Sequence, residues 1–205
     1  MLNLEQIILS VPAILLAIAF HELGHAYAAY KLGDPTPKYQ GRLTLNPFAH
    51  LDPLGTIMLL LFRIGWARPV VINPQYFKNR KRDTVLVSLA GPLANVLLGW
   101  LFYNLLRLAT GYVPIGSFAR SLFLFFLLNV QINLSLAAFN LLPIPPLDGS
   151  NIVAGILPPK LEYEFSRLAP YGPIILIILL ISGGARLIIN PIYGLLSQLI
   201  IRLSF

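Results

Sequence analysis

The chain has 205 residues, of which 57% are hydrophobic and only 11% are charged, and its formal net charge is +7. Soluble domains carry roughly 25% charged residues, so this chain has too few charges to cover a water-facing surface and is expected to lie in a membrane. The absence of cysteine excludes disulfides, iron–sulfur clusters and thiol catalysis. The basic residues flank apolar runs and form no sustained basic face with stacking aromatics, so we expect no nucleic-acid partner.

The first apolar segment, at residues 4–32, is long enough to cross a bilayer as a helix of about 43 Å. It lacks a basic n-region and continues past the length of an h-region, so we expect it to be retained rather than cleaved as a signal peptide. Residues 38–45 then alternate in a way that favours one or two short strands. Such a strand would be a candidate edge for pairing with an extended peptide.

Apolar segments in the rest of the chain predict four further membrane-spanning helices, at residues 84–109, 117–142, 170–182 and 187–203. Residues 54–64 are equally apolar but too short for a standard span. Basic residues follow the first span, precede the second and follow the third, so the positive-inside rule places all three loops in the cytoplasm. The N-terminus is then outside and the C-terminus inside.

The first span ends and the second span begins on the cytoplasmic side of the membrane. The short apolar segment between them therefore cannot cross the membrane once. It must dip in and return or lie along the interface, with its polar backbone groups satisfied by protein or by a water cavity. We expect an all-α polytopic membrane protein of five spans with a small re-entrant β element, or six spans if residues 54–72 do cross. The chain is interpreted as one membrane-embedded domain over residues 1–205, with a catalytic core at about 4–150 and C-terminal helices at about 151–205.

The first span contains the sequence His21-Glu22-Leu23-Gly24-His25. On a helix this spacing places both imidazoles on one face, one turn apart, where they can bind a single Zn²⁺. Zinc lowers the pKa of water toward neutrality, and the Glu22 carboxylate is close enough to complete the deprotonation. Ionisable residues inside an apolar span each cost a few kcal/mol, which favours function over an inert polar patch paired across the bundle. The motif is that of a zinc protease.

A catalytic zinc also needs a third protein ligand. Most other acidic residues lie at the far end of the first helix, in the loop beyond it or in hydrated, mixed-charge stretches, which leaves Asp52 and Asp148, with His50 as a nitrogen alternative. Asp148 is favoured because it follows a proline cluster at the cytoplasmic end of the third span. His21 and His25 lie about 10–17 Å from the cytoplasmic end of their own helix, so all three approach from one side.

Three motifs together resemble the site-2 proteases, a family of intramembrane zinc metalloproteases. They are HELGH in the first span, Gly91-Pro92-Leu93-Ala94-Asn95 at the start of the second, and NLLPIPPLDG at residues 140–149. Residues 41–56 (GRLTLNPFAHLDPLGT) look like the compact single-module form of the family, without the PDZ or CBS domains that members often carry. The resemblance covers about residues 4–149.

The resemblance implies one zinc ion held by His21, His25 and Asp148, with Glu22 as the general base. It also implies regulated intramembrane proteolysis, in which a peptide bond is hydrolysed within or near a transmembrane segment of a substrate protein whose helix must partly unwind.

Two asparagines are secondary candidates for contact with the substrate. Asn140 would donate a hydrogen bond to the substrate carbonyl or the developing oxyanion, or else cross-link helices. Asn95 is assigned more readily to close helix packing, with a substrate contact as the alternative. His50 and Asp52 are balanced between lining the entrance to the site and forming the turn before Pro53.

The partners expected are the lipid bilayer and a substrate with a transmembrane helix, and a homo-oligomer is left open. We expect a multi-pass protein of the cell membrane with its site nearer the cytoplasmic face. A metal-ion transporter using the same residues is a rival interpretation, although the fourth and fifth spans offer no further polar path. A catalytically inactive scaffold is disfavoured, because the full set of ligands and base is intact.

Overall fold

The computed structural model describes residues 4–55, 67–114 and 116–204. Within these residues the regular structure is helical, apart from one antiparallel bridge between Leu51 and Ala67. Five helical segments are long and apolar enough to cross a membrane. The predicted all-α polytopic fold is therefore confirmed.

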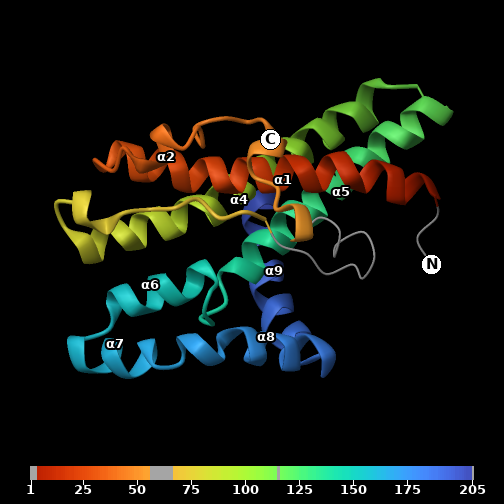
Figure 1. Ribbon diagram of the computed structural model, residues 1–205. Coiled ribbons are helices and arrows are strands. Elements are labelled where there is room, and N and C mark those ends of the chain that lie inside the picture. The colour runs from red at the N-terminus through yellow and green to blue at the C-terminus, as the bar shows by residue number, and fades with distance from the viewer. Residues whose placement is uncertain (1–3, 56–66, 115, 205) are drawn as a thin grey trace.

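Three helices form the core of the bundle: α1 (Leu4–Lys31), α4 (Arg80–Tyr112) and α5 (Ser117–Asn140), each packed against the other two (Figure 1). The backbones of α1 and α4 approach closely at Gly24, where an added methyl group would lie 2.6 Å from the Ala90 carbonyl oxygen. Small residues permit such close packing between membrane helices. The buried side of α1 is accordingly rich in alanine: Ala13, Ala17, Ala19, Ala26 and Ala29.

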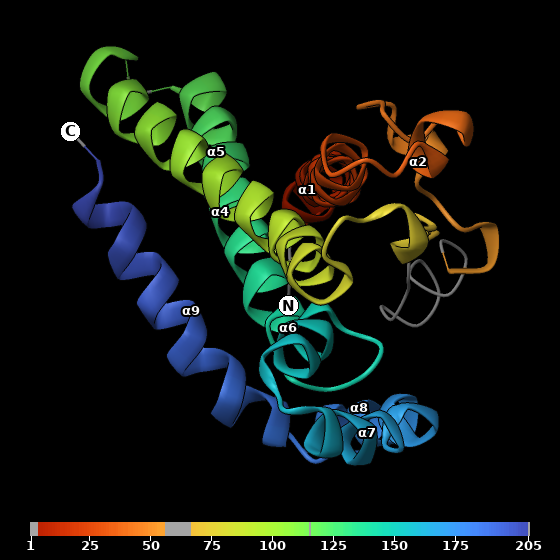
Figure 2. The same ribbon diagram turned by 90° about the vertical axis from the view of Figure 1, so that its left-hand side faces the viewer.

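The last helix, α9 (Gly184–Arg202), covers the outer side of α4 and α5. In Figure 2, α1 is seen end-on while α9 runs across the view, so the two helices cross at a steep angle. Ile200 of α9 is buried against Leu98 and Phe102 of α4 and Leu134 of α5. This apolar cluster, which Leu16 and Phe20 of α1 also contact, fixes α9 to the core.

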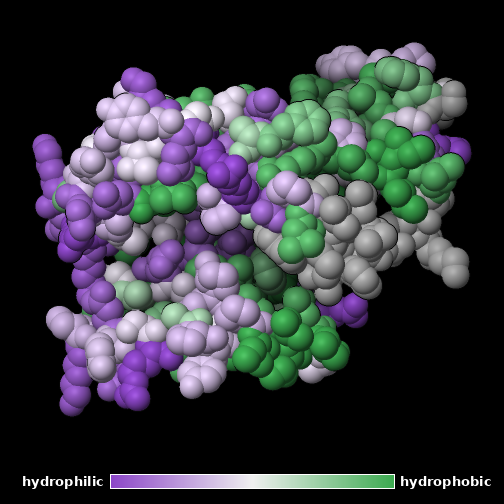
Figure 3. Space-filling model, viewed as in Figure 1, coloured by the Kyte–Doolittle hydropathy of each residue, from purple (hydrophilic) through white to green (hydrophobic). Residues whose placement is uncertain are grey.

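The fourth span is longer than the sequence predicted. Helix α8 (Gly172–Ile181) would be only about 15 Å long by itself, but the helical run begins at α7 (Pro159–Ser166) and continues through η3 (Ala169–Tyr171). Together, residues 159–181 are long enough to cross. Figure 3 shows hydrophobic side chains over α8 and over the right-hand part of the molecule. Hydrophilic side chains gather on the left-hand side, over α2, the beginning of α4 and α7.

The predicted strand at residues 38–45 is wrong. Its first two residues belong to the short helix α2 (Thr36–Tyr39), because the Asp34 carboxylate accepts from the Thr36 N–H at 2.9 Å and Pro37 has the fixed φ that suits a first helical turn. Gly41 then turns the chain with a φ of +66°. Among residues 56–66, which carry most of the predicted re-entrant segment, no residue lies within the described part of the chain.

Two side chains hold the irregular region after α1. The fully buried Asp34 carboxylate accepts from the backbone N–H of Thr36 and, at 2.7 Å, from that of Asn73, just before η2 (Pro74–Tyr76). The buried Arg42 guanidinium donates to the carbonyl oxygens of Ala49 and Arg68. These bonds bring residues 67–73 back beside α1.

Asp34→Ala is expected to destabilise the protein by about 1–3 kcal/mol for each buried N–H that loses its acceptor. Asp34→Asn keeps one amide oxygen and should have an intermediate effect. Thermal unfolding in detergent micelles measures both. An alanine variant that unfolds at the wild-type temperature would contradict the role given to this carboxylate.

Candidate metal centre and active site

His21 and His25 are buried on the side of α1 that faces α4, and Asp148 reaches them from the first residue of α6 (Asp148–Ile156). The two Nε2 atoms lie 3.1 Å apart, and the Asp148 Oδ2 lies 3.2 Å from each. Tetrahedral zinc with bonds of about 2.0–2.1 Å separates its ligand atoms by about 3.3–3.4 Å. The triangle of ligand atoms is therefore only slightly smaller than the one that zinc requires.

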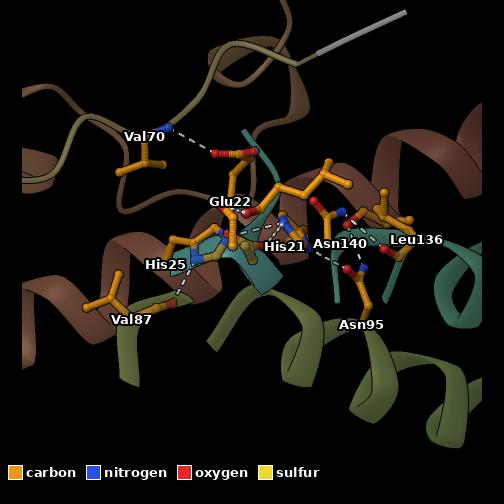
Figure 4. Close-up of polar contacts among 12 residues, drawn as sticks. His21, Glu22, His25, Val70, Val87, Asn95, Leu136 and Asn140 are labelled. Atoms are coloured by element: carbon orange, nitrogen blue, oxygen red, sulfur yellow. Dashed lines mark hydrogen bonds and ion pairs between the residues drawn. The ribbon is translucent and has the colours of Figure 1, made fainter. Parts of the chain in front are cut away.

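Hydrogen bonds orient both imidazoles for ligation (Figure 4). The His25 Nδ1 lies 2.8 Å from the Val87 carbonyl oxygen, which can only accept, so Nδ1 carries the proton. The His21 Nδ1 donates to the Asn95 Oδ1 at 2.7 Å. Each Nε2 is then left with a lone pair directed at the other and at Asp148. Three acceptors at this distance repel one another unless a cation lies between them, so the residues fit a metal ion.

The carboxylate of Asp148 is suited to act as the anionic ligand. Its Oδ2 is buried and finds no hydrogen-bond donor among the described residues. Burial raises the pKa of Asp148, but imidazoles of His21 and His25 that carry a proton on Nε2 outweigh burial and hold that pKa below its usual value before a metal binds. The carboxylate is thus ionised at neutral pH, and a metal ion would take the place of the imidazole proton.

Two glycines give the three ligands room. A methyl group on Gly91 of α4 would collide with the His25 Nε2 and lie 2.9 Å from the His21 Cε1. A methyl group on Gly149 would collide with the carbonyl oxygens of Leu141 and Leu142 at the end of α5. The start of α6 can therefore lie against the residues that directly follow α5, while α6 itself packs against α4, and these contacts hold Asp148 near the histidines.

Glu22 lies beside the ligands and faces a cavity of about 660 Å³. Its Oε2 accepts from the Val70 N–H at 3.0 Å, which fixes the carboxylate from the side opposite α1. Apolar side chains of α1 and α5 make up most of the lining, with Gln131, Ser135 and Asn140 as polar members. Such a cavity can receive an apolar peptide segment next to a base and a metal site.

The other candidate residues differ in whether they line the cavity. Asn140 lines the cavity, and its Nδ2 donates to the Leu136 carbonyl oxygen at 3.0 Å. Asn95 is fully buried and does not line the cavity, and its Oδ1 accepts from the His21 Nδ1. The buried His50 bonds the Thr44 carbonyl oxygen, and Asp52 accepts from the Gly55 N–H. Neither His50 nor Asp52 belongs to the ligand group found among the described residues.

Sequence reasoning missed the partners that hold the site from outside. Val70 and Val87 contribute backbone groups, and nothing in a sequence pattern marks them. Asn133 is different, because it is fully buried on α5 within an apolar span and accepts from the Asn95 Nδ2. Polar side chains inside a span are a functional signal by default, so Asn133 could have been found.

A helix bundle of this kind, with HExxH histidines and a distant carboxylate converging inside it, defines a membrane metalloprotease. Residues 112–180 match the model of peptidase family M50. The chain is 43% identical over 183 residues to YwhC of Bacillus subtilis (strain 168), which covers 88% of this chain and 84% of that protein. The chain therefore belongs to peptidase family M50, the site-2 protease family.

Two more distant relatives agree. Rip2 of Mycolicibacterium smegmatis is 31% identical over 180 residues, covering 85% of this chain and 67% of that protein. MJ0611 of Methanocaldococcus jannaschii is 33% identical over 151 residues, covering 71% of this chain and 69% of that protein. All three relatives are provisionally named zinc metalloproteases. No solved structure matches the chain significantly.

Gly91→Ala is expected to lower zinc affinity, because the new methyl group would displace both imidazoles from Asp148. Displacing such contacts around a metal site typically costs 10–100-fold in affinity. Gly111→Ala is the matched control, since an added methyl group on the same helix meets nothing within 4 Å. Competition with a zinc chelator in detergent measures both variants, and equal affinities for the two would refute this role of Gly91.

Proposed function

We propose that the chain is a site-2-type zinc metalloendopeptidase that hydrolyses a peptide bond within or near a transmembrane segment of a substrate protein. The observation that carries the proposal is the depth of the site. His21 lies ten residues, or about 15 Å, from the Lys31 end of α1, and about 26 Å from the Leu4 end. A substrate that reaches this depth in a bilayer about 30 Å thick is itself a membrane-embedded segment.

Zinc, when bound, supplies a Lewis acid that polarises the scissile carbonyl and lowers the pKa of a water molecule. Glu22 takes the proton from the attacking water and passes it to the nitrogen of the leaving amine. The Val70 N–H keeps the carboxylate beside the histidines during both transfers. Asn140 has a second Nδ2 hydrogen besides the one given to Leu136, and it can donate this hydrogen to the substrate carbonyl.

The cavity also indicates the form of the substrate. Its lining includes Ile14 and Ile18 of α1 and Phe139 of α5, so it favours apolar side chains. In an intact helix each carbonyl accepts from the N–H four residues later and is surrounded by side chains. The substrate helix must therefore unwind locally before a peptide bond can reach Glu22.

We assign the site to the cytoplasmic half of the cell membrane. Lys31 and Arg80 lie at the ends of α1 and α4 nearer the histidines, and Lys38 lies on α2 just beyond α1. Basic residues favour the cytoplasmic side. Labelling of single cysteines introduced at Lys38 and at Gly116 in intact cells tests this orientation, because only the outer position should react with an impermeant reagent.

Glu22→Gln is expected to lower proteolysis by roughly 10²–10⁴-fold, because the amide cannot accept the proton. Zinc should stay bound, since no ligand changes and the amide oxygen can still accept from Val70. The measurement compares membrane-protein fragments in cells that express wild type or variant, with zinc counted in the purified protein.

Glu5→Gln is the matched control on the same helix, because Glu5 lies at the opposite end and bonds Ser121 of α5. It should cleave like wild type. Purified protein in liposomes separates the rival function: a metal-ion transporter would move zinc into the vesicles, whereas a protease would not. Zinc flux without cleavage, or full cleavage by Glu22→Gln, would refute the proposal.

A further inference from the structure

Three fully buried asparagines lie outside the lining of the cavity: Asn95 on α4, and Asn129 and Asn133 on α5. Burying an amide in an apolar bundle is costly unless its hydrogen bonds are made. Two of the three are joined side chain to side chain, and one of those two touches a metal ligand. Their connections decide what each can do.

Backbone carbonyls fix the orientation of each amide, because a carbonyl oxygen can only accept. The Asn95 Nδ2 lies 2.9 Å from the Ala17 carbonyl oxygen, so this atom is the nitrogen and the Asn95 Oδ1 faces His21. The Asn133 Nδ2 lies 2.9 Å from the Asn129 carbonyl oxygen, so the Asn133 Oδ1 faces Asn95.

Both hydrogens of the Asn95 amide are then used, one by Ala17 and one by the Asn133 Oδ1 at 2.9 Å. Asn95 can offer His21 only an acceptor. The His21 Nδ1 must therefore carry the proton, and the lone pair lies on Nε2, 3.2 Å from Asp148. The tautomer of His25 is fixed by a backbone carbonyl, that of Val87. The tautomer of His21 is fixed by side chains, those of Asn95 on α4 and Asn133 on α5.

We propose that Asn95 is a positioning residue that holds His21 in the tautomer and orientation that bind zinc, and that Asn133 acts through Asn95 by fixing its amide. The inference rests on the proposed function only for the presence of zinc. Asn129 lies outside this relay, because its backbone carbonyl, not its side chain, bonds Asn133. Its Nδ2 donates to Phe125, and its Oδ1 finds no partner among the described residues.

Zinc affinity of the purified full chain, measured by chelator competition in detergent, tests the proposal. Asn95→Leu removes the acceptor for His21 and should weaken zinc binding by about 10–100-fold. Asn95→Asp keeps an acceptor for His21 but places an oxygen against the Ala17 carbonyl oxygen and the Asn133 Oδ1. It should restore most of the affinity, because a carboxylate is a common partner for a ligating histidine. A residue that only packs helices would give the reverse order, with leucine tolerated better than aspartate.

Asn133→Leu and Asn129→Leu form the second comparison, made at equal burial on one helix. Asn133→Leu should weaken zinc binding, by less than Asn95→Leu, and Asn129→Leu should leave it unchanged. This pair decides the question if Asn95→Leu fails to fold. Wild-type affinity in both Asn95→Leu and Asn133→Leu, or an equal loss in the two Asn133 and Asn129 variants, would overturn the proposal. A wild-type chain that binds zinc but cleaves nothing would sink the proposed function and leave this inference standing.

Discussion

The whole arrangement depends on three electron-pair donors that are held 3.1–3.2 Å apart inside an apolar helix bundle. Such a group is stable only when a cation or protons lie between its members and when each donor is oriented from outside. The structure meets the second condition with Val87 behind His25 and Asn95 behind His21. It makes space for the imidazoles by leaving a bare glycine at position 91 of the facing helix. The orientation of the imidazoles also requires the close approach of α1 and α4. With a wider separation, Val87 and Asn95 could not form hydrogen bonds with His25 and His21.

Much of the site could be predicted from the sequence, because it depends on short-range periodicity and on topology. The four-residue spacing of His21 and His25 places them on one helix face wherever that helix lies. Asp148 could be selected because charge bias and the proline cluster put it at the same depth, and the structure does bring its Oδ2 to both histidines. The backbone groups of Val70 and Val87 could not be predicted, since every residue has them and only the tertiary packing chooses which two are used.

The errors have local causes. Residues 38–45 alternate like a strand, but the side chain of Asp34 and the fixed geometry of Pro37 begin a helical turn that local alternation does not reveal. The sequence predicts the fourth span only from residue 170, because the charged residues of α7 are typical of a polar loop, although in the structure they belong to the helical run that leads into α8. Ile200 of α9 packs in an apolar cluster with residues of α4 and α5, and no pattern within α9 itself specifies those partners.

The three ligands come from segments of the chain that are far apart, two from the opening helix and one from the start of α6, which is 123 residues beyond His25. An ion bound by all three would close this long loop much as a disulfide does, in a protein that has no cysteine. Its free energy of binding would then be added to the free energy of folding, because the unfolded chain has no such site. The same centre would thus cross-link the two ends of the catalytic core. A chelator would then lower the stability of the protein as well as inactivate it.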